Sequence, residues 1–229
     1  EFGMTVRLVS KGNYRQQSYF DGLLRNRATK TWDISDTGTT VYQRNAFDFK
    51  NQPTYQSRPS ASTATRYGVI TQYDALGRVT SVDDNATSGA VTYSYLTDDR
   101  VSVNDNKGNV TTTTYLSYGQ PSQSFPTVIS SPENVTTSMI YNLYGNVTRI
   151  AQGGEYEYRV YDSYQNLCKT RREDTGLKAF QYDAAGQLSW LAYGSSIDSS
   201  TTSCDTSVNS NEKTTYSYDN RGQVKSVVY

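Results

Sequence analysis

Apolar and polar residues alternate on both sides of a short polar break in the segment TQYDALGRVTSV, residues 71–82. Alternation with a period of two predicts β-strands, and the break predicts a tight turn between them. Asp74 can hydrogen-bond the backbone of the residues that follow it, and Gly77 can adopt the left-handed conformation that closes such a turn. The segment therefore predicts a β-hairpin with a glycine bulge.

The same frame fits the chain nine times, each time starting at an aromatic residue. The four strongest copies are YDALGRV at Tyr73, YNLYGNV at Tyr141, YDAAGQL at Tyr182 and YDNRGQV at Tyr218. They share a turn Asp or Asn (Asp74, Asn142, Asp183, Asp219) and a turn glycine (Gly77, Gly145, Gly186, Gly222). Partial copies start at Phe20, Phe47, Tyr95, Tyr115 and Tyr161, the last followed by Asp162. Such self-similarity, with a unit of about 20 residues, indicates a repeat protein.

Two partial copies depart from the frame at the glycine position, where Leu24 and Gln165 stand. A side chain in the left-handed region costs roughly 1 kcal/mol or more. We therefore expect altered turns in the units that start at Phe20 and Tyr161. Asp and Asn tolerate this region better, so Asp99 and Asn51 are acceptable at the same position.

Each unit also needs a return turn, which is clearest in NDNKGNVTTTTY, residues 104–115. Asp105 and Gly108 repeat the turn chemistry there, so one unit is two strands and two turns. Nine units predict about eighteen antiparallel strands, and an open sheet of more than about ten strands must curl, split or close. We predict an all-β fold, a long curved sheet of hairpin repeats over residues 4–229. Residues 1–3 are expected to be left over from cloning.

Composition agrees with a sheet that has little core. Hydrophobic residues make up 35% of the chain, below the roughly 45–50% of globular domains, while 21 tyrosines suit a half-buried pleated surface. Three segments rich in Ser, Thr and Pro, residues 55–66, 121–134 and 194–213, predict loop insertions. Lys plus Arg equals Asp plus Glu at 22 each, which does not favour nucleic acid as a partner. No segment approaches the ~20 apolar residues of a membrane span.

Candidate catalytic chemistry is sparse. The sequence has no histidine, which excludes Ser-His-Asp, Cys-His and histidine-ligated metal arrangements within this chain. The acidic pairs Asp83 with Asp84 and Asp98 with Asp99 fall in or beside predicted turns, where Asp serves the backbone. We expect no enzyme activity, no cofactor and no metal site.

The two cysteines leave two possibilities open. Cys168 follows the turn of the Tyr161 unit, and Cys204 lies in the longest insertion. Either a disulfide pins that loop to the sheet, or the chain carries two separate thiols. A disulfide would favour an extracytoplasmic location.

The repeated tyrosines also have two interpretations. Held in register, they would form ladders that stabilise the sheet through cross-strand contacts. If their faces are exposed, they would instead be platforms for sugar rings.

The frame Y-D-x-x-G-[RNQ]-V resembles the YD repeat of RHS proteins, Tc-toxin shell components and teneurins. The resemblance runs from about Phe20 to the C-terminus, with YDALGRVTSV and YDAAGQLSW as close copies and the units at Phe20 and Phe47 as degenerate ones. It implies β-hairpins that spiral into a hollow shell around a C-terminal polymorphic toxin domain. We find no toxin domain, end-plug or self-cleaving aspartate site in this chain.

The resemblance thus implies a non-enzymatic segment of shell wall in a large secreted or surface bacterial protein. Its partner would be a toxin or other cargo domain downstream in the same polypeptide. The alternative is a module that binds carbohydrate or a cell surface through the tyrosine-rich face or the Ser/Thr-rich loops.

Overall fold

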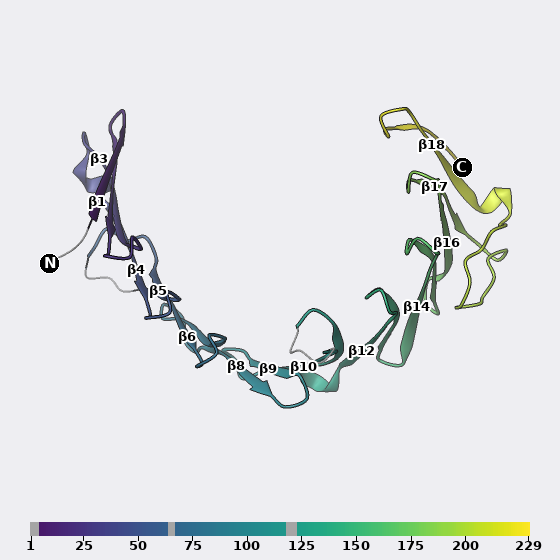
Figure 1. Cartoon of the computed structure of the whole chain (residues 1–229), viewed down its shortest axis with the longest axis horizontal. Helices are drawn as coiled ribbons and strands as arrows, with labels where there is room; N and C mark the ends of the chain where they lie inside the picture. The colour runs from purple at the N-terminus through teal and green to yellow at the C-terminus, as the bar shows by residue number, and fades with distance from the viewer. Residues whose placement is uncertain (1–4, 64–66, 118–122) are drawn as a thin grey trace. The chain divides into compact units, whose positions relative to one another are not determined.

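The computed structural model describes residues 5–63, 67–117 and 123–229, which form an all-β protein (Figure 1). These residues contain 19 strands and three 3-10 helices, η1 (Thr37–Thr39), η2 (Pro132–Asn134) and η3 (Ser210–Glu212). No helix in this part of the chain is long and apolar enough to cross a membrane. The predicted all-β class of antiparallel hairpins is confirmed. The proposed cloning residues 1–3 and the turn of the Tyr115 unit lie outside the described residues.

The chain divides into two compact units, of which the first comprises residues 1–96 and 101–110. From β1 to β8, each strand pairs antiparallel with the next one in the chain. The strands are β1 (Thr5–Lys11), β2 (Tyr14–Phe20), β3 (Asn26–Asp33), β4 (Val41–Phe47), β5 (Pro53–Ser57), β6 (Gly68–Tyr73), β7 (Val79–Asp84), β8 (Val91–Leu96) and β9 (Arg100–Asn104). Among the described side chains of this unit, the buried ones are the polar Ser18 and Ser57.

The second unit comprises residues 97–100 and 111–229. From β10 to β19, each strand again pairs antiparallel with the next. The strands are β10 (Val110–Tyr115), β11 (Pro126–Ser130), β12 (Thr136–Tyr141), β13 (Val147–Gln152), β14 (Glu155–Tyr161), β15 (Leu167–Arg172), β16 (Gly176–Tyr182), β17 (Leu188–Tyr193), β18 (Lys213–Tyr218) and β19 (Val224–Val228). Its small apolar cluster consists of Ala179, Trp190, Ala192, Ile197 and Val208.

A β-bulge follows the turn at the same place in one repeat after another. Tyr73 pairs with Val79 and Gln72 pairs with Ser81, so Thr80 has no opposite residue. The same shift occurs in the units that start at Phe20, Phe47, Tyr141, Tyr161, Tyr182 and Tyr218. Bulges bend a strand and re-aim side chains. The repeats therefore share a backbone register as well as a sequence motif.

The predicted loop insertions differ in outcome. Segment 121–134 is not loop throughout, because β11 lies within it and pairs with both β10 and β12. Its Val128 and Ile129 are β-branched and pair across the sheet, and this local pattern outweighs the surrounding Ser and Pro. Residues 55–57 of segment 55–66 belong to β5. Segment 194–213 contains only η3 and the first residue of β18 as regular structure.

Candidate functional site

The turn that follows a repeat aromatic residue, here called the YD turn, is closed in six of the repeats by four hydrogen bonds around its Asp or Asn. Asp74 Oδ1 accepts from the backbone N–H groups of Leu76 and Arg78, both at 2.9 Å. The Asp74 N–H donates to the Arg78 carbonyl at 2.9 Å, and the Gly77 N–H donates to the Asp74 carbonyl at 3.0 Å. The same four bonds recur at Asp21, Asn142, Asp162, Asp183 and Asp219, and in the return turn at Asp105.

The altered turns expected at Leu24 and Gln165 are not found. Leu24 has φ 60° and Gln165 has φ 67°, so both adopt the left-handed conformation that glycine takes elsewhere. Each net hydrogen bond contributes about 0.5–1.5 kcal/mol, so four of them outweigh a strain of roughly 1 kcal/mol. Gln165 gains further support because its Oε1 accepts from the side-chain amides of Asn142 and Asn146, both at 3.1 Å.

The turn that does differ belongs to the Tyr95 unit. Leu96 stands where the other units carry Asp or Asn, so the carboxylate that organises the YD turn is missing. Asp98 and Asp99 have φ values of 60° and 53°. Two successive left-handed residues are the signature of a type I′ hairpin turn. The missing turn Asp, and not the missing glycine, therefore changes the turn.

The residue after the turn glycine binds either within its own turn or to the next turn. The Arg78 guanidinium pairs with Asp74 at 2.7 Å within its own turn. Hydrogen bonds from the backbone N–H of Arg78, and then from its guanidinium, lower the pKa of Asp74 against the opposing effect of burial. Gln52, at the equivalent position, instead reaches the next turn, where its Nε2 donates to the Gly77 carbonyl at 2.8 Å. This explains why Arg, Asn and Gln recur at that position.

The repeat tyrosine ties its unit to the preceding strand through its hydroxyl. Six such bonds, between 2.8 and 3.0 Å, join Tyr73 to the carbonyl of Pro53, Tyr95 to Val79, Tyr141 to Pro126, Tyr161 to Val147, Tyr182 to Leu167 and Tyr218 to Leu188. Burial raises the pKa of the Tyr141 and Tyr182 hydroxyls. The tyrosines thus act through hydrogen bonds along the sheet in addition to the cross-strand contacts expected of a ladder.

At least one residue of each acidic pair is engaged in local structure through its side chain. Asp84 forms an ion pair with Arg58, and its Oδ1 accepts from the Ala86 N–H at 3.2 Å. Asp99 accepts a hydrogen bond from the Ser117 hydroxyl. Within the described ranges, no group of three or more His, Cys, Asp or Glu residues is placed to hold a metal ion.

Residues 194–212, here called the strap, are joined covalently to β15. Cys168 and Cys204 form a disulfide with a Cα–Cα distance of 5.5 Å. Cys168 is the bulge residue of its unit, because Tyr161 pairs with Leu167 and Val160 pairs with Lys169. The bulge frees the Cys168 side chain from the alternation of the ladder and directs it to the strap.

Next to the disulfide lies a buried ion pair that the sequence analysis missed. Lys169 Nζ is 2.6 Å from Asp205 Oδ2, and the two side chains are 1% and 5% exposed. Lys169 Nζ also donates to the carbonyls of Asp198 at 3.0 Å and Ser200 at 3.2 Å. The sequence held one indication of this pair: Lys169 directly follows Cys168, and Asp205 directly follows Cys204. The two neighbouring links hold one stretch of the strap against one stretch of β15.

Beyond this ion pair, the strap is anchored to the sheet by hydrogen bonds, including one from the Arg171 guanidinium to the Ser199 carbonyl at 3.2 Å, and by two apolar side chains. Ile197 and Val208 are its buried apolar residues, and they pack on Ala179, Trp190 and Ala192. Each buried apolar side chain contributes about 1.5–3 kcal/mol, whereas ordering the backbone costs about 1–2 kcal/mol per residue. A buried ion pair roughly offsets its own desolvation. The disulfide, which would contribute about 4 kcal/mol for a loop of this length, is therefore a major part of what holds the strap down.

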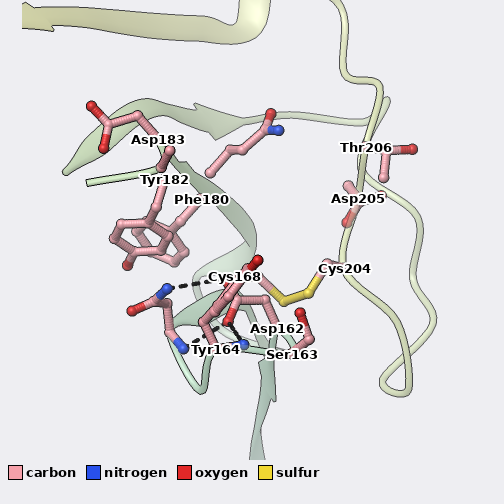
Figure 2. Close-up of a pocket in the computed structure, with 13 residues that line it drawn as sticks. Asp162, Ser163, Tyr164, Cys168, Phe180, Tyr182, Asp183, Cys204, Asp205 and Thr206 are labelled. Carbon is pink, nitrogen blue, oxygen red and sulfur yellow. Dashed lines mark hydrogen bonds between the residues drawn. A yellow bond between two sulfur atoms is a disulfide. The ribbon is translucent and has the colours of Figure 1, made fainter. Parts of the chain in front are cut away.

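A hollow of about 300 Å³ opens beside the disulfide (Figure 2). Both cysteines line it, together with the aromatic side chains of Tyr164, Phe180 and Tyr182. Figure 2 shows the disulfide bridging from the strand to the strap, with Asp205 and Thr206 on the strap side. Both cysteines therefore border a space that a small molecule can enter.

These contacts define an all-β hairpin-repeat protein in which turn, bulge and tyrosine hydroxyl recur as one unit. No protein-family model matches the chain, and no curated protein matches it. Two solved structures are similar over 97% of this chain: TcdB2-TccC3-Cdc42, with 12% identity and a TM-score of 0.48, and the Photorhabdus luminescens Tc holotoxin pore, with 9% identity and a TM-score of 0.33. The chain spans 15% and 17% of their lengths.

Proposed function

We propose that this chain is a non-enzymatic section of the wall of an RHS-type shell, which encloses or presents a toxin encoded downstream in the same polypeptide. The observation that carries the proposal is the tyrosine contact. Six repeat hydroxyls bind backbone carbonyls of preceding strands, so the motif residues are used to join hairpins. Such an array extends by adding units, as expected of a wall.

Two further observations support this proposal. The carboxylates of the YD turns accept backbone hydrogen bonds, which is a structural use. The disulfide between Cys168 and Cys204 suits an extracellular protein, because such bonds persist in oxidising compartments.

The test uses the polypeptide that carries this chain together with its downstream region. We expect limited proteolysis to leave the downstream region uncut while the array is intact. Tyr182→Ala, which removes both the hydroxyl bond and the ring, should make that region cleavable, whereas Tyr164→Ala, at an 86% exposed side chain, should not. Immediate cleavage of the downstream region in the unaltered protein contradicts encapsulation.

A second candidate function is glycan or cell-surface binding. The observation that favours it is the exposure of Tyr144 and Tyr164, at 74% and 86%, on the tips of two YD turns. Aromatic rings presented in this way are suited to stacking on sugars. Binding on a glycan array that disappears in a Tyr144→Ala, Tyr164→Ala double variant supports this candidate, and silence across a broad array removes it.

A further inference from the structure

We propose that the middle of the strap, residues 198–206, is a redox-sensitive latch that stays on β15 while Cys168 and Cys204 are bonded and lifts away when they are reduced. This inference goes beyond the wall function and does not depend on it. It rests on the disulfide, on the ion pair beside it, and on the hollow that both cysteines line.

The contacts of this stretch with β15 come from three residues of the strand, Cys168, Lys169 and Arg171, the last of which donates to the Ser199 carbonyl at 3.2 Å. Cys204 is bonded to Cys168, and Asp205 pairs with Lys169. The apolar anchors Ile197 and Val208 lie outside residues 198–206. Because a buried ion pair roughly offsets its desolvation and each hydrogen bond from Lys169 or Arg171 to the carbonyls of residues 198–200 has a small net effect, the covalent bond is the strongest contact that keeps the middle of the strap ordered.

The ends of the strap are fastened separately, so opening is confined to its middle. The Ser196 N–H donates to Glu212 Oε2 at 3.2 Å, and the Asn209 N–H donates to Ser196 Oγ at 3.0 Å. These bonds join the two ends of the strap to each other and involve neither cysteine. Reduction therefore releases residues 198–206, here called the arm, between two fixed points. It does not detach the whole strap.

The strand is built to survive the loss of the bond. In two other units the bulge residue is Thr148 or Ser189, whose hydroxyl donates to the carbonyl of Ile140 at 3.2 Å or of Gln181 at 2.9 Å. Cys168 Sγ lies 3.3 Å from the equivalent carbonyl, that of Val160. Once reduced, the Cys168 thiol can donate there as the hydroxyls do, so the sheet keeps its bulge.

The reaction is ordinary thiol–disulfide exchange with an external dithiol. A dithiol enters through the hollow, and its thiolate attacks the sulfur of Cys204, which is the more exposed cysteine. A mixed disulfide forms at Cys204, and Cys168 leaves as a thiolate that takes up a proton. The second thiol of the reagent then displaces Cys204, which is also protonated, and the reagent departs as a cyclic disulfide. Two electrons and two protons pass from the reagent to the protein.

Lys169 provides the readout, because it is 1% exposed under the closed arm. The full chain, oxidised or reduced with dithiothreitol and freed of reagent under nitrogen, is treated briefly with an amine-acetylating ester. The peptides are then quantified by mass spectrometry. We expect acetylation of Lys169 to rise by about tenfold or more on reduction, as local opening predicts, while the exposed Lys107 reacts equally in both states.

Two variants and one further measurement make the test decisive. Cys204→Ser and Cys168→Thr, the latter with the residue type that the Tyr141 unit carries at its bulge, should both show rapid acetylation of Lys169 without reductant. Amide hydrogen exchange in β15 and β16 should remain slow in every sample. The proposal is overturned if Lys169 stays protected in the fully reduced chain, or if β15 and β16 lose protection together with the arm.

Discussion

The Tyr182 hydroxyl donates a 3.0 Å hydrogen bond to the Leu167 carbonyl, which places the aromatic residue of one repeat on the strand that begins after the preceding YD turn. Leu167 is also the residue that pairs with Tyr161, the aromatic residue of that preceding repeat. Leu167 thus contacts the aromatic residues of two successive repeats. This sharing joins the hairpins without a large core.

Removal of the hydroxyl alone should weaken the sheet. We expect Tyr182→Phe to lower the free energy of unfolding by about 1 kcal/mol, because the Leu167 carbonyl loses its donor in a partly buried place. Tyr164→Phe is the matched control and should change stability by less than about 0.5 kcal/mol, since that side chain is 86% exposed. Urea unfolding followed by circular dichroism measures both. Equal effects for the two variants would show that the hydroxyl bond is not a stabilising contact.

The left-handed positions without glycine allow a stabilising change. Leu24→Gly should raise the free energy of unfolding by about 1 kcal/mol, because Leu24 has φ 60° and is 71% exposed. Gln165→Gly should give less or none of this gain, since it also removes the two bonds that Gln165 accepts from Asn142 and Asn146. Thermal unfolding of both variants tests the comparison. A larger gain at residue 165 than at residue 24 would contradict it.

Gly68 is required for a close approach of two strands. A Cβ at this position would lie 2.3 Å from the Gln56 carbonyl oxygen and 2.6 Å from the Ser57 Cα. We expect Gly68→Ala to destabilise the chain by roughly 1–3 kcal/mol, because backbone has to move. Gly22→Ala is the control, since nothing lies within 4 Å of a Cβ there and its φ is not positive. Hydrogen exchange in β5 and β6 should rise in the first variant only.

Acid should weaken the YD turn of Asp74. The pKa of Asp74 is lowered from its ordinary value of 3.8, mainly by the Arg78 backbone N–H and then by its guanidinium. A carboxylate with a depressed folded-state pKa contributes stability above its unfolded pKa, and this contribution is lost as pH falls through the folded value. Unfolding midpoints in urea should therefore fall as the pH is lowered below 3.8, the ordinary value from which the pKa of Asp74 is depressed. Asp74→Asn, which keeps an acceptor as Asn142 does, should flatten this dependence; an unchanged slope would contradict the assignment.

Most of the repeating unit could be predicted from sequence, because turn chemistry and strand alternation are local. The hydrogen bonds of Asp74 and Gly77 follow from residue type and spacing. The turns at Leu24 and Gln165 were mispredicted because a single-residue strain was weighed without the four bonds that oppose it. The strand β11 was missed because average composition obscured Val128 and Ile129.

The contacts of the strap lay beyond sequence reasoning for a different reason. Whether Cys168 meets Cys204 depends on where a long insertion returns to the sheet, which no local pattern specifies. Lys169 was overlooked because a lysine on a strand is ordinarily solvated, and its burial depends on Asp205 arriving with the strap. Likewise, the tyrosine hydroxyls needed the three-dimensional register before their acceptors could be named.

The tyrosine hydroxyl bonds can form in the order in which the chain is synthesised. In each of the six contacts, the tyrosine that donates comes later in the chain than the carbonyl that accepts. A growing polypeptide is made from its N-terminus, so each of these tyrosines leaves the ribosome after its acceptor has already been synthesised. At any length, the nascent chain contains the partner of every such tyrosine that it holds. The contacts can therefore close in the order in which the ribosome makes them, one hairpin after another.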